Sequence, residues 1–139
     1  SRLNKNNIEN IIKKYELIID GSDNFKTKFL VNDYCIKYKK KLITGAISKF
    51  DGHIFTFDFK DNKTASLKNF YQESKISDDD LNCEFEGVIG TTASIVGTTQ
   101  ANEALKMIME IGQNLKNQIL IIDLLNLNFR KVKFKKNRL

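Results

Sequence analysis

The sequence lacks several features that would narrow its class at once. It has no proline in 139 residues, and only one histidine, two cysteines and seven glycines. Without proline or a low-complexity linker, nothing in the sequence marks a domain boundary. A length of 139 residues suits one domain, since single domains commonly have about 100–150 residues. We therefore expect residues 1–139 to form a single domain.

Long apolar runs are also absent. No stretch approaches the roughly 20 apolar residues that a membrane helix requires. The N-terminus, SRLNKNNIEN, lacks both the apolar core of a signal peptide and an initiator Met, so we expect the chain to begin at an expressed-fragment or domain boundary. Cys35 and Cys83 form no CxxC pair and have no histidine at metal spacing, which excludes a disulfide framework and an obvious zinc site. These absences predict a soluble, cytoplasmic protein with no membrane partner.

Positive charge exceeds negative charge, with a net charge of +6 and a pI near 9.3. The excess is spread as lysine over a Lys-, Asn- and Ile-rich chain, which favours a compositional bias over a nucleic-acid site. The densest basic run, FRKVKFKKNRL, alternates with Val132 and Phe134, and such alternation indicates a strand before it indicates a nucleic-acid-binding tail. The sequence therefore disfavours nucleic acid as a partner.

Hydrophobic periodicity predicts an α/β fold. Helical spacing from Ile8 to Tyr15 precedes an apolar strand at Leu17–Asp20, and a second helix begins near Phe25 and ends in a lysine-rich run before a buried strand at Leu42–Ser48. This alternation of helices and strands favours neighbouring parallel strands. The pattern then changes: an Asp51-Gly52 turn leads into a strand with one aromatic face, which we expect to extend the sheet in antiparallel fashion.

The second half contains three further features. Residues 61–81 are polar and irregular, which predicts a long surface loop with at most a short helix at 67–71. A segment rich in small residues, GVIGTTASIVGTTQANEALKMIMEIG, predicts a long, closely packed helix that ends at Gly112. Two final strands, at 119–124 and 129–134, are expected to be joined by a turn at 126–128.

The stretch IIDGSDNF places Asp20 and Asp23 where the first strand ends and a helix begins. In open α/β sheets ligands bind at the carboxyl ends of strands, and a carboxylate there can hold Mg²⁺ together with phosphate oxygens. Spacing alone favours a local role, because Asp, Ser and Asn dominate turns, and either Asp23 or Asn24 could cap the helix. Both interpretations stay open at this point.

The other reactive side chains give weaker signals. His53 has no Ser or Cys nucleophile identifiable beside it in the sequence, so we expect a surface residue rather than a catalyst. Cys35 lies on the apolar face of a predicted helix and is expected in the core. Cys83 follows a polar loop and precedes a glycine-containing segment, an exposed setting in which a thiolate could act.

Taken together, three motifs resemble the C-terminal half of the ThiF/MoeB/HesA family, the bacterial relatives of ubiquitin-activating enzymes. The motifs are YELIIDGSDNFKTKFLVNDYC with the strands that follow it, NCEFEGVIGTTASIVGTTQANEALKMIMEIG, and ILIIDLLNLNFRKVKF. They fall in the family's order and cover nearly the whole chain. The resemblance implies a Rossmann-like α/β domain whose parallel strands are continued by antiparallel strands.

The resemblance also implies an activity. Family members use Mg-ATP to adenylate the C-terminal glycine of a ubiquitin-like sulfur-carrier protein of the thiamine or molybdopterin type, usually as homodimers. Asp23 matches the Asp of the family's TDN motif, which is associated with magnesium and the ATP phosphates, and Asn24 is the next residue of that motif. Cys83 matches a cysteine that several members place where a carrier's C-terminus can be attacked, although only part of its immediate context is kept.

The sequence departs from the family pattern in three ways. The family's glycine-rich nucleotide loop precedes the first motif and has no counterpart here, so we expect these residues alone not to form a competent ATP site. Ala65 and Lys68 stand where many members place the first CxxC pair of a structural zinc site, so we expect no zinc. Thr27-Lys28 replaces a Thr-Arg pair, which weakens a bidentate phosphate contact there.

Two functions therefore remain as hypotheses. The chain could be part of an adenylyltransferase completed by an N-terminal chain, or a non-enzymatic relative that binds a ubiquitin-like carrier or mediates dimerisation, with Asp23 reduced to a helix cap.

Overall fold

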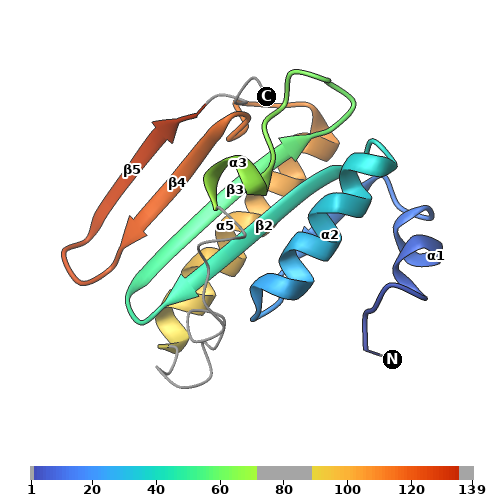
Figure 1. The fold of residues 1–139 in the computed structure, drawn as a ribbon. Helices are drawn as coiled ribbons and strands as arrows, with labels where there is room; N and C mark the ends of the chain where they lie inside the picture. The colour runs from blue at the N-terminus through green and yellow to red at the C-terminus, as the bar shows by residue number, and fades with distance from the viewer. Residues whose placement is uncertain (1, 72–88, 135–139) are drawn as a thin grey trace.

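A computed structural model describes residues 2–71 and 89–134. These residues form one five-stranded mixed sheet with strand order β1-β2-β3-β4-β5, flanked by helices (Figure 1). The elements in chain order are α1 (Ile8–Ile12), β1 (Leu17–Asp20), α2 (Phe25–Lys37), β2 (Lys41–Ser48), β3 (Asp51–Asp58), α3 (Leu67–Phe70), α5 (Gly90–Met109), β4 (Gln118–Asp123) and β5 (Asn128–Lys133). The predicted α/β class is confirmed.

The parallel part of the sheet is the unit β1-α2-β2. β1 pairs with β2 in parallel, with Leu17 opposite Lys41 and Asp20 opposite Thr44, and α2 forms the crossover. β1 ends at Asp20 whereas β2 continues to Ser48, so the chain leaves the sheet at Asp20 beside a strand that runs on. From β2 onwards the neighbouring strands β2 to β5 pair in antiparallel fashion, as expected from the sequence.

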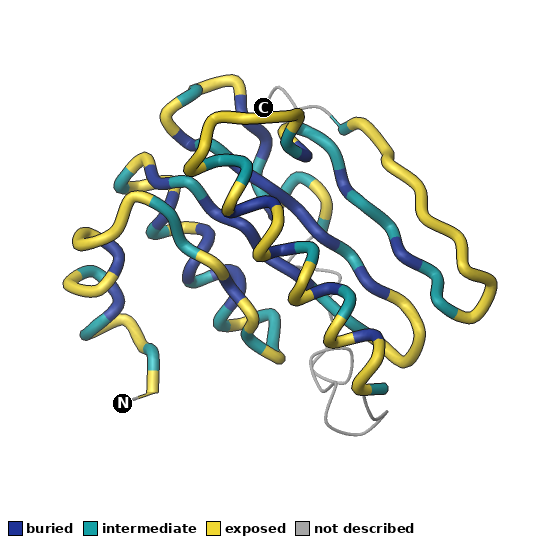
Figure 2. The backbone as a smooth tube through the Cα atoms, turned by 180° about the vertical axis from the view of Figure 1, so that it is seen from behind, coloured by how far each residue is buried: buried dark blue, intermediate teal, exposed yellow. Residues whose placement is uncertain are grey.

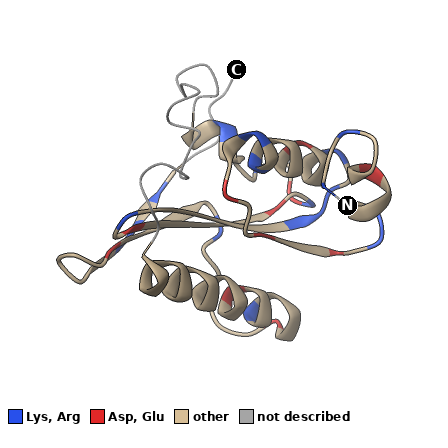
Figure 3. Ribbon diagram, turned by 90° about the horizontal axis from the view of Figure 1, so that it is seen from below, with Lys and Arg blue, Asp and Glu red and all other residues tan. Residues whose placement is uncertain are grey.

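Helices cover both faces of the sheet, and residues of the two cores alternate along the central strands β2, β3 and β4. Among the described helices, α5 is the one that Figure 3 shows on its own side of the sheet, and Figure 2 shows the buried positions running along the central strands. The core on the side of α1 and α2 includes Ile8, Phe29 and Cys35. It also includes Phe55 and Phe57 of β3 and Phe59 just after the strand, which stack with centroid distances of 5.8 and 5.4 Å. The core beneath α5 is smaller and contains Ile43, Ile54 and Val96.

α5 approaches the sheet closely because two strand residues are glycines. A Cβ added at Gly45 would lie 2.8 Å from Val96 Cγ1, and one added at Gly52 would lie 2.5 Å from Val96 Cγ2. The glycines within α5 play no such part, since a Cβ at Gly90 or Gly97 would meet nothing within 4 Å. The predicted long helix is therefore present, but its close packing depends on glycines of β2 and β3 rather than on its own.

Several predicted boundaries need correction. The turn between β2 and β3 is Lys49-Phe50, because Ser48 already pairs with Asp51, so Asp51 and Gly52 belong to β3. Lys49 adopts the positive φ of 48° that this tight turn requires. Glu110, with a φ of 55°, is the left-handed C-cap of α5 in place of Gly112. The first helix ends at Ile12, and both C-terminal strands begin and end one residue earlier than predicted.

The segment after β3 contributes to the core in the part that the structure describes. Within residues 61–71, Thr64, Ala65 and Leu67 are buried, so this part does not form the surface loop expected for residues 61–81. The predicted short helix is α3. In the described ranges, no helix is both long enough and apolar enough to cross a membrane.

Candidate functional site

The carboxyl end of β1 is organised around the buried carboxylate of Asp20, which is 5% exposed. Its Oδ1 accepts hydrogen bonds from the Ser22 backbone N–H (2.9 Å) and from Ser22 Oγ (2.6 Å). These contacts make the Asx-type turn that the sequence suggested for Asp20. They account for only one of the two carboxylate oxygens.

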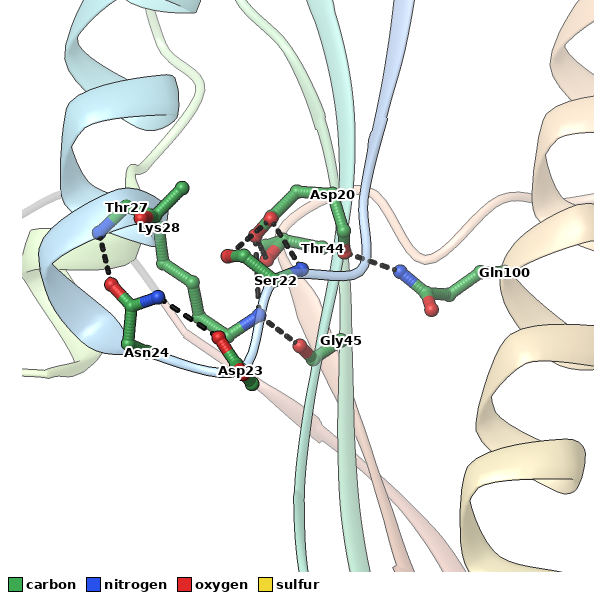
Figure 4. Close-up of polar contacts among 9 residues, drawn as sticks. All are labelled: Asp20, Ser22, Asp23, Asn24, Thr27, Lys28, Thr44, Gly45 and Gln100. Atoms are coloured by element: carbon green, nitrogen blue, oxygen red, sulfur yellow. Dashed lines mark hydrogen bonds and ion pairs between the residues drawn. The ribbon is translucent and has the colours of Figure 1, made fainter. Parts of the chain in front are cut away.

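The other oxygen, Oδ2, holds a buried ion pair. Lys28 Nζ lies 3.2 Å away, and both side chains are 4% exposed. Thr44 Oγ1 on β2 donates to the same oxygen at 2.6 Å, while Lys28 Nζ also donates to the Gly45 carbonyl (Figure 4). A charged pair removed from water is tolerated only when its remaining hydrogen-bonding capacity is satisfied, as it is here. Asp20 is therefore more than a turn former: it ties β1 to α2 and β2.

Lys28 accordingly faces inward. Its ammonium group contacts Asp20 and the Gly45 carbonyl, so it is engaged in the core rather than presented at the surface. In the sequence, the Thr27-Lys28 pair weakened the case for a bidentate phosphate contact here. The buried position of the Lys28 ammonium group agrees with that expectation.

Asn24, not Asp23, caps α2. Asn24 Oδ1 accepts a hydrogen bond from the Thr27 backbone N–H at 2.8 Å, which satisfies one of the orphan donors at the start of the helix. Its Nδ2 donates to Asp23 Oδ1 at 2.9 Å. Asn24 thus fills the capping role and leaves the Asp23 carboxylate outside the helix hydrogen-bond network.

Asp23 is exposed at the edge of the sheet where β1 ends. The Asn24 amide, with smaller contributions from the backbone and the charge of Lys28, holds the pKa of the Asp23 carboxyl below its usual value. The side chain is therefore ionised at neutral pH. An exposed, ionised carboxylate oxygen at the carboxyl end of a parallel strand can bind a hard cation, and the neighbouring helix N-terminus favours the phosphate oxygens that would share it.

Gln100, on α5, reaches the same place from the opposite face of the sheet. Its Nε2 donates to the Asp20 carbonyl at 2.9 Å, and the side chain is 5% exposed. The sequence analysis did not single out Gln100. Its only signal is a polar residue at a position of the long helix where spacing from Val96 and Ala104 predicts burial.

His53 is not the surface residue expected from the sequence. It is half-buried on β3, and its Nδ1 lies 2.6 Å from the Tyr71 hydroxyl. Phe70 packs edge-on against the imidazole, and Tyr71 also contacts Phe25, the first residue of α2. Burial lowers the pKa of His53, against a smaller opposing effect of Asp51. Among the contacts of the described residues, no Ser or Cys side chain is hydrogen-bonded to His53.

The structure tests the prediction for Cys35 but not the one for Cys83. Cys35 is fully buried in the core, as predicted, and burial raises the pKa of its thiol to about 12, so it is unreactive at neutral pH. Cys83 lies outside the described residues.

Of the two residues aligned with the zinc pair, Ala65 is buried and Lys68 pairs with Asp33. Residues 2–71 and 89–134 contain no cluster of three or more His, Cys, Asp or Glu side chains that could enclose a metal ion.

Known structures share this architecture. Escherichia coli MccB with ATP superposes with a TM-score of 0.73 at 15% identity over 97% of this chain and 41% of MccB. PaaA superposes with a TM-score of 0.69 at 12% identity, over 96% of this chain and 40% of PaaA. At this level of identity the likeness concerns the fold alone, and it agrees with the predicted Rossmann-like α/β fold.

Sequence comparison gives the family. The ThiF family model matches residues 1–139, so the chain belongs to the ThiF family. A probable molybdopterin-synthase adenylyltransferase of Pyropia yezoensis is 37% identical over 134 residues, which are 96% of this chain and 35% of the relative. The sulfur carrier protein adenylyltransferase of Thermus thermophilus is 33% identical over 139 residues, 98% of this chain and 51% of the relative. The chain thus spans about a third to a half of the length of these relatives.

We predict that Lys28→Met destabilises the fold by about 3–5 kcal/mol, because it leaves the Asp20 carboxylate buried without its cation. Urea unfolding measures the effect. The matched control is Lys116→Met, which removes an exposed ion pair of 2.8 Å with Asp61 and should cost about 0–1 kcal/mol. Equal effects of the two substitutions would contradict the central role of the buried pair.

The His53 contact predicts a pH dependence of stability. Because the pKa of His53 is lower in the folded state than the usual 6.5, the unfolded chain binds more protons between these two values. The free energy of unfolding should therefore be at its plateau above pH 6.5 and fall as the pH decreases toward the folded-state pKa. His53→Gln should abolish this slope in urea titrations. Since the sequence has one histidine, a slope retained in the variant would show that another group causes it.

Proposed function

We propose that this chain is part of an ATP-dependent adenylyltransferase that activates the C-terminal glycine of a ubiquitin-like sulfur-carrier protein, and that it contributes the part of the active site that contains Asp23. Support comes from relatives of 33–37% identity that are named as adenylyltransferases of molybdopterin synthase or of a sulfur carrier protein. The rest of the site, above all a glycine-rich phosphate loop, would come from residues outside these 139 or from a partner chain, including a second copy in a homodimer.

The observation that carries the proposal is the exposed, ionised carboxylate of Asp23 at the carboxyl end of β1. The capping role that would explain Asp23 without any chemistry is filled by Asn24. The role of Asp20 is equally accounted for, by Lys28 and Ser22. Asp23 is thus the carboxylate at this edge that the fold holds in place without using it to stabilise itself.

The residues at this edge suit magnesium bound together with ATP. Mg²⁺ commonly takes one or two protein carboxylates and completes its shell with water and substrate phosphates, so a single Asp suffices on the protein side. Asp23 would hold the ion, and Asn24 would orient the Asp23 carboxylate through its amide. When bound, the ion neutralises phosphate charge as the carrier's carboxylate displaces pyrophosphate.

The alternative is a non-enzymatic relative that binds a carrier or mediates dimerisation. It predicts carrier binding without chemistry, and the assay below separates it from the enzyme.

We predict that Asp23→Ala abolishes ATP–pyrophosphate exchange driven by a carrier that ends in Gly-Gly, with a loss of about a hundredfold or more, since a positioned charge at the phosphates is removed. Exchange is measured on this chain and on the longest product of its gene. Asp33→Ala serves as control, because Asp33 is an exposed carboxylate of α2, away from the end of β1, that pairs with Lys68 across the surface. Carrier binding with no exchange in either wild-type protein would instead support the binding module.

We further propose that Cys83 accepts the activated carrier. Its thiolate would attack the acyl-adenylate carbonyl, AMP would leave, and a thioester would form. Cys83→Ser should leave pyrophosphate exchange intact and remove the thiol-sensitive conjugate seen by denaturing mass spectrometry. An unchanged amount of conjugate would exclude Cys83 as the nucleophile.

A further inference from the structure

The peptide that leads from β1 into the Asp23 loop is held from both faces of the sheet. On the α2 side, the Asp20 carboxylate is fixed by Lys28 and Thr44. On the α5 side, the Asp20 carbonyl is fixed by Gln100 Nε2, a residue 80 positions further along the chain. Figure 4 shows Gln100 reaching the Asp20 backbone from α5 while the carboxylate points away toward α2.

Gln100 has little freedom at this position. It is nearly fully buried, and it lies over Gly45, where an added Cβ would come within 2.9 Å of its Cδ and Oε1 atoms. The missing side chain at Gly45 is therefore what allows Gln100 to reach the Asp20 carbonyl. Gly45 also accepts a hydrogen bond from Lys28 through its own carbonyl, so one residue of β2 supports both contacts.

The geometry points to Gln100 as a positioning residue for Asp23. The carbonyl that Gln100 holds belongs to the Asp20–Gly21 peptide, and the orientation of that peptide sets the direction in which the chain runs to Asp23. This inference rests on the proposed function, because it assigns Gln100 a role in the same site. It adds a contribution from α5, on the far face of the sheet, to a site otherwise built from β1, β2 and α2.

A second polar contact of α5 provides the matched control. Thr56 Oγ1 on β3 donates to Glu103 Oε2 at 2.9 Å, and both residues are buried. This bond joins the same helix to the same sheet one turn further along, but it does not touch the Asp23 loop. Gln100→Met and Thr56→Val each remove one such bond with little change in size.

The test compares these variants in two measurements. Backbone residual dipolar couplings of residues 21–24 report the orientation of the loop peptides, and the kcat and KM of pyrophosphate exchange report the site. We expect Gln100→Met to change these couplings and to lower kcat about tenfold or more, with a smaller change in the KM for ATP. Thr56→Val should leave both unchanged. Measurements are made where each variant is fully folded by circular dichroism.

A second pair of variants separates positioning from general packing. Gly45→Ala displaces both Val96 and Gln100, whereas Gly52→Ala displaces Val96 alone. The proposal requires Gly45→Ala to reproduce the effect of Gln100→Met on residues 21–24, and Gly52→Ala to destabilise the fold without that effect.

The assignment would be overturned if the couplings of residues 21–24 were unchanged in Gln100→Met. It would also be overturned if Thr56→Val and Gly52→Ala changed these couplings as much as Gln100→Met does. If the wild-type proteins show no exchange, the proposed function fails, and the couplings alone still decide whether Gln100 positions the loop.

Discussion

The buried ion pair between Asp20 and Lys28 is the contact on which the candidate site depends. Both side chains are almost fully removed from water, a costly arrangement unless every polar atom finds a partner. Ser22, Thr44 and the Gly45 carbonyl supply those partners. Ser22 lies in the loop, Thr44 and Gly45 lie on β2, and Lys28 lies on α2. The requirement to satisfy one carboxylate therefore fixes the relative position of the elements that meet where β1 ends.

The need to satisfy the buried carboxylate gives different roles to Asp20 and Asp23, which lie three positions apart. The Asp20 carboxylate is engaged in buried contacts that hold the fold together, and Asn24 caps α2. Asp23 therefore stays exposed and ionised beside them. A structure that satisfies its local polar groups with other residues can present one carboxylate to a ligand. The chain belongs to the ThiF family, and in the proposed function the ligand of that carboxylate would be magnesium shared with the phosphates of ATP.

Local patterns predicted most of the fold, because strand alternation and helix periodicity are properties of neighbouring residues. β1 begins and ends as expected, and α2 begins at the predicted residue. Long-range pairing was out of reach: Lys28, Thr44 and Gln100 lie 8, 24 and 80 positions from Asp20. Gly52 was assigned to a turn because glycine favours turns, whereas the approach of Val96 explains it. The candidate role of Asp23 came from the family resemblance, since spacing alone favoured a cap.

Amide hydrogen exchange of the unmodified protein tests most directly whether the loop before α2 is held as described. The account predicts that the amides of Ser22 and Thr27, bonded to Asp20 Oδ1 and Asn24 Oδ1, exchange about as slowly as those of the β1–β2 ladder. Exchange of both amides at the rate of an unprotected loop, with the ladder still protected, would contradict it.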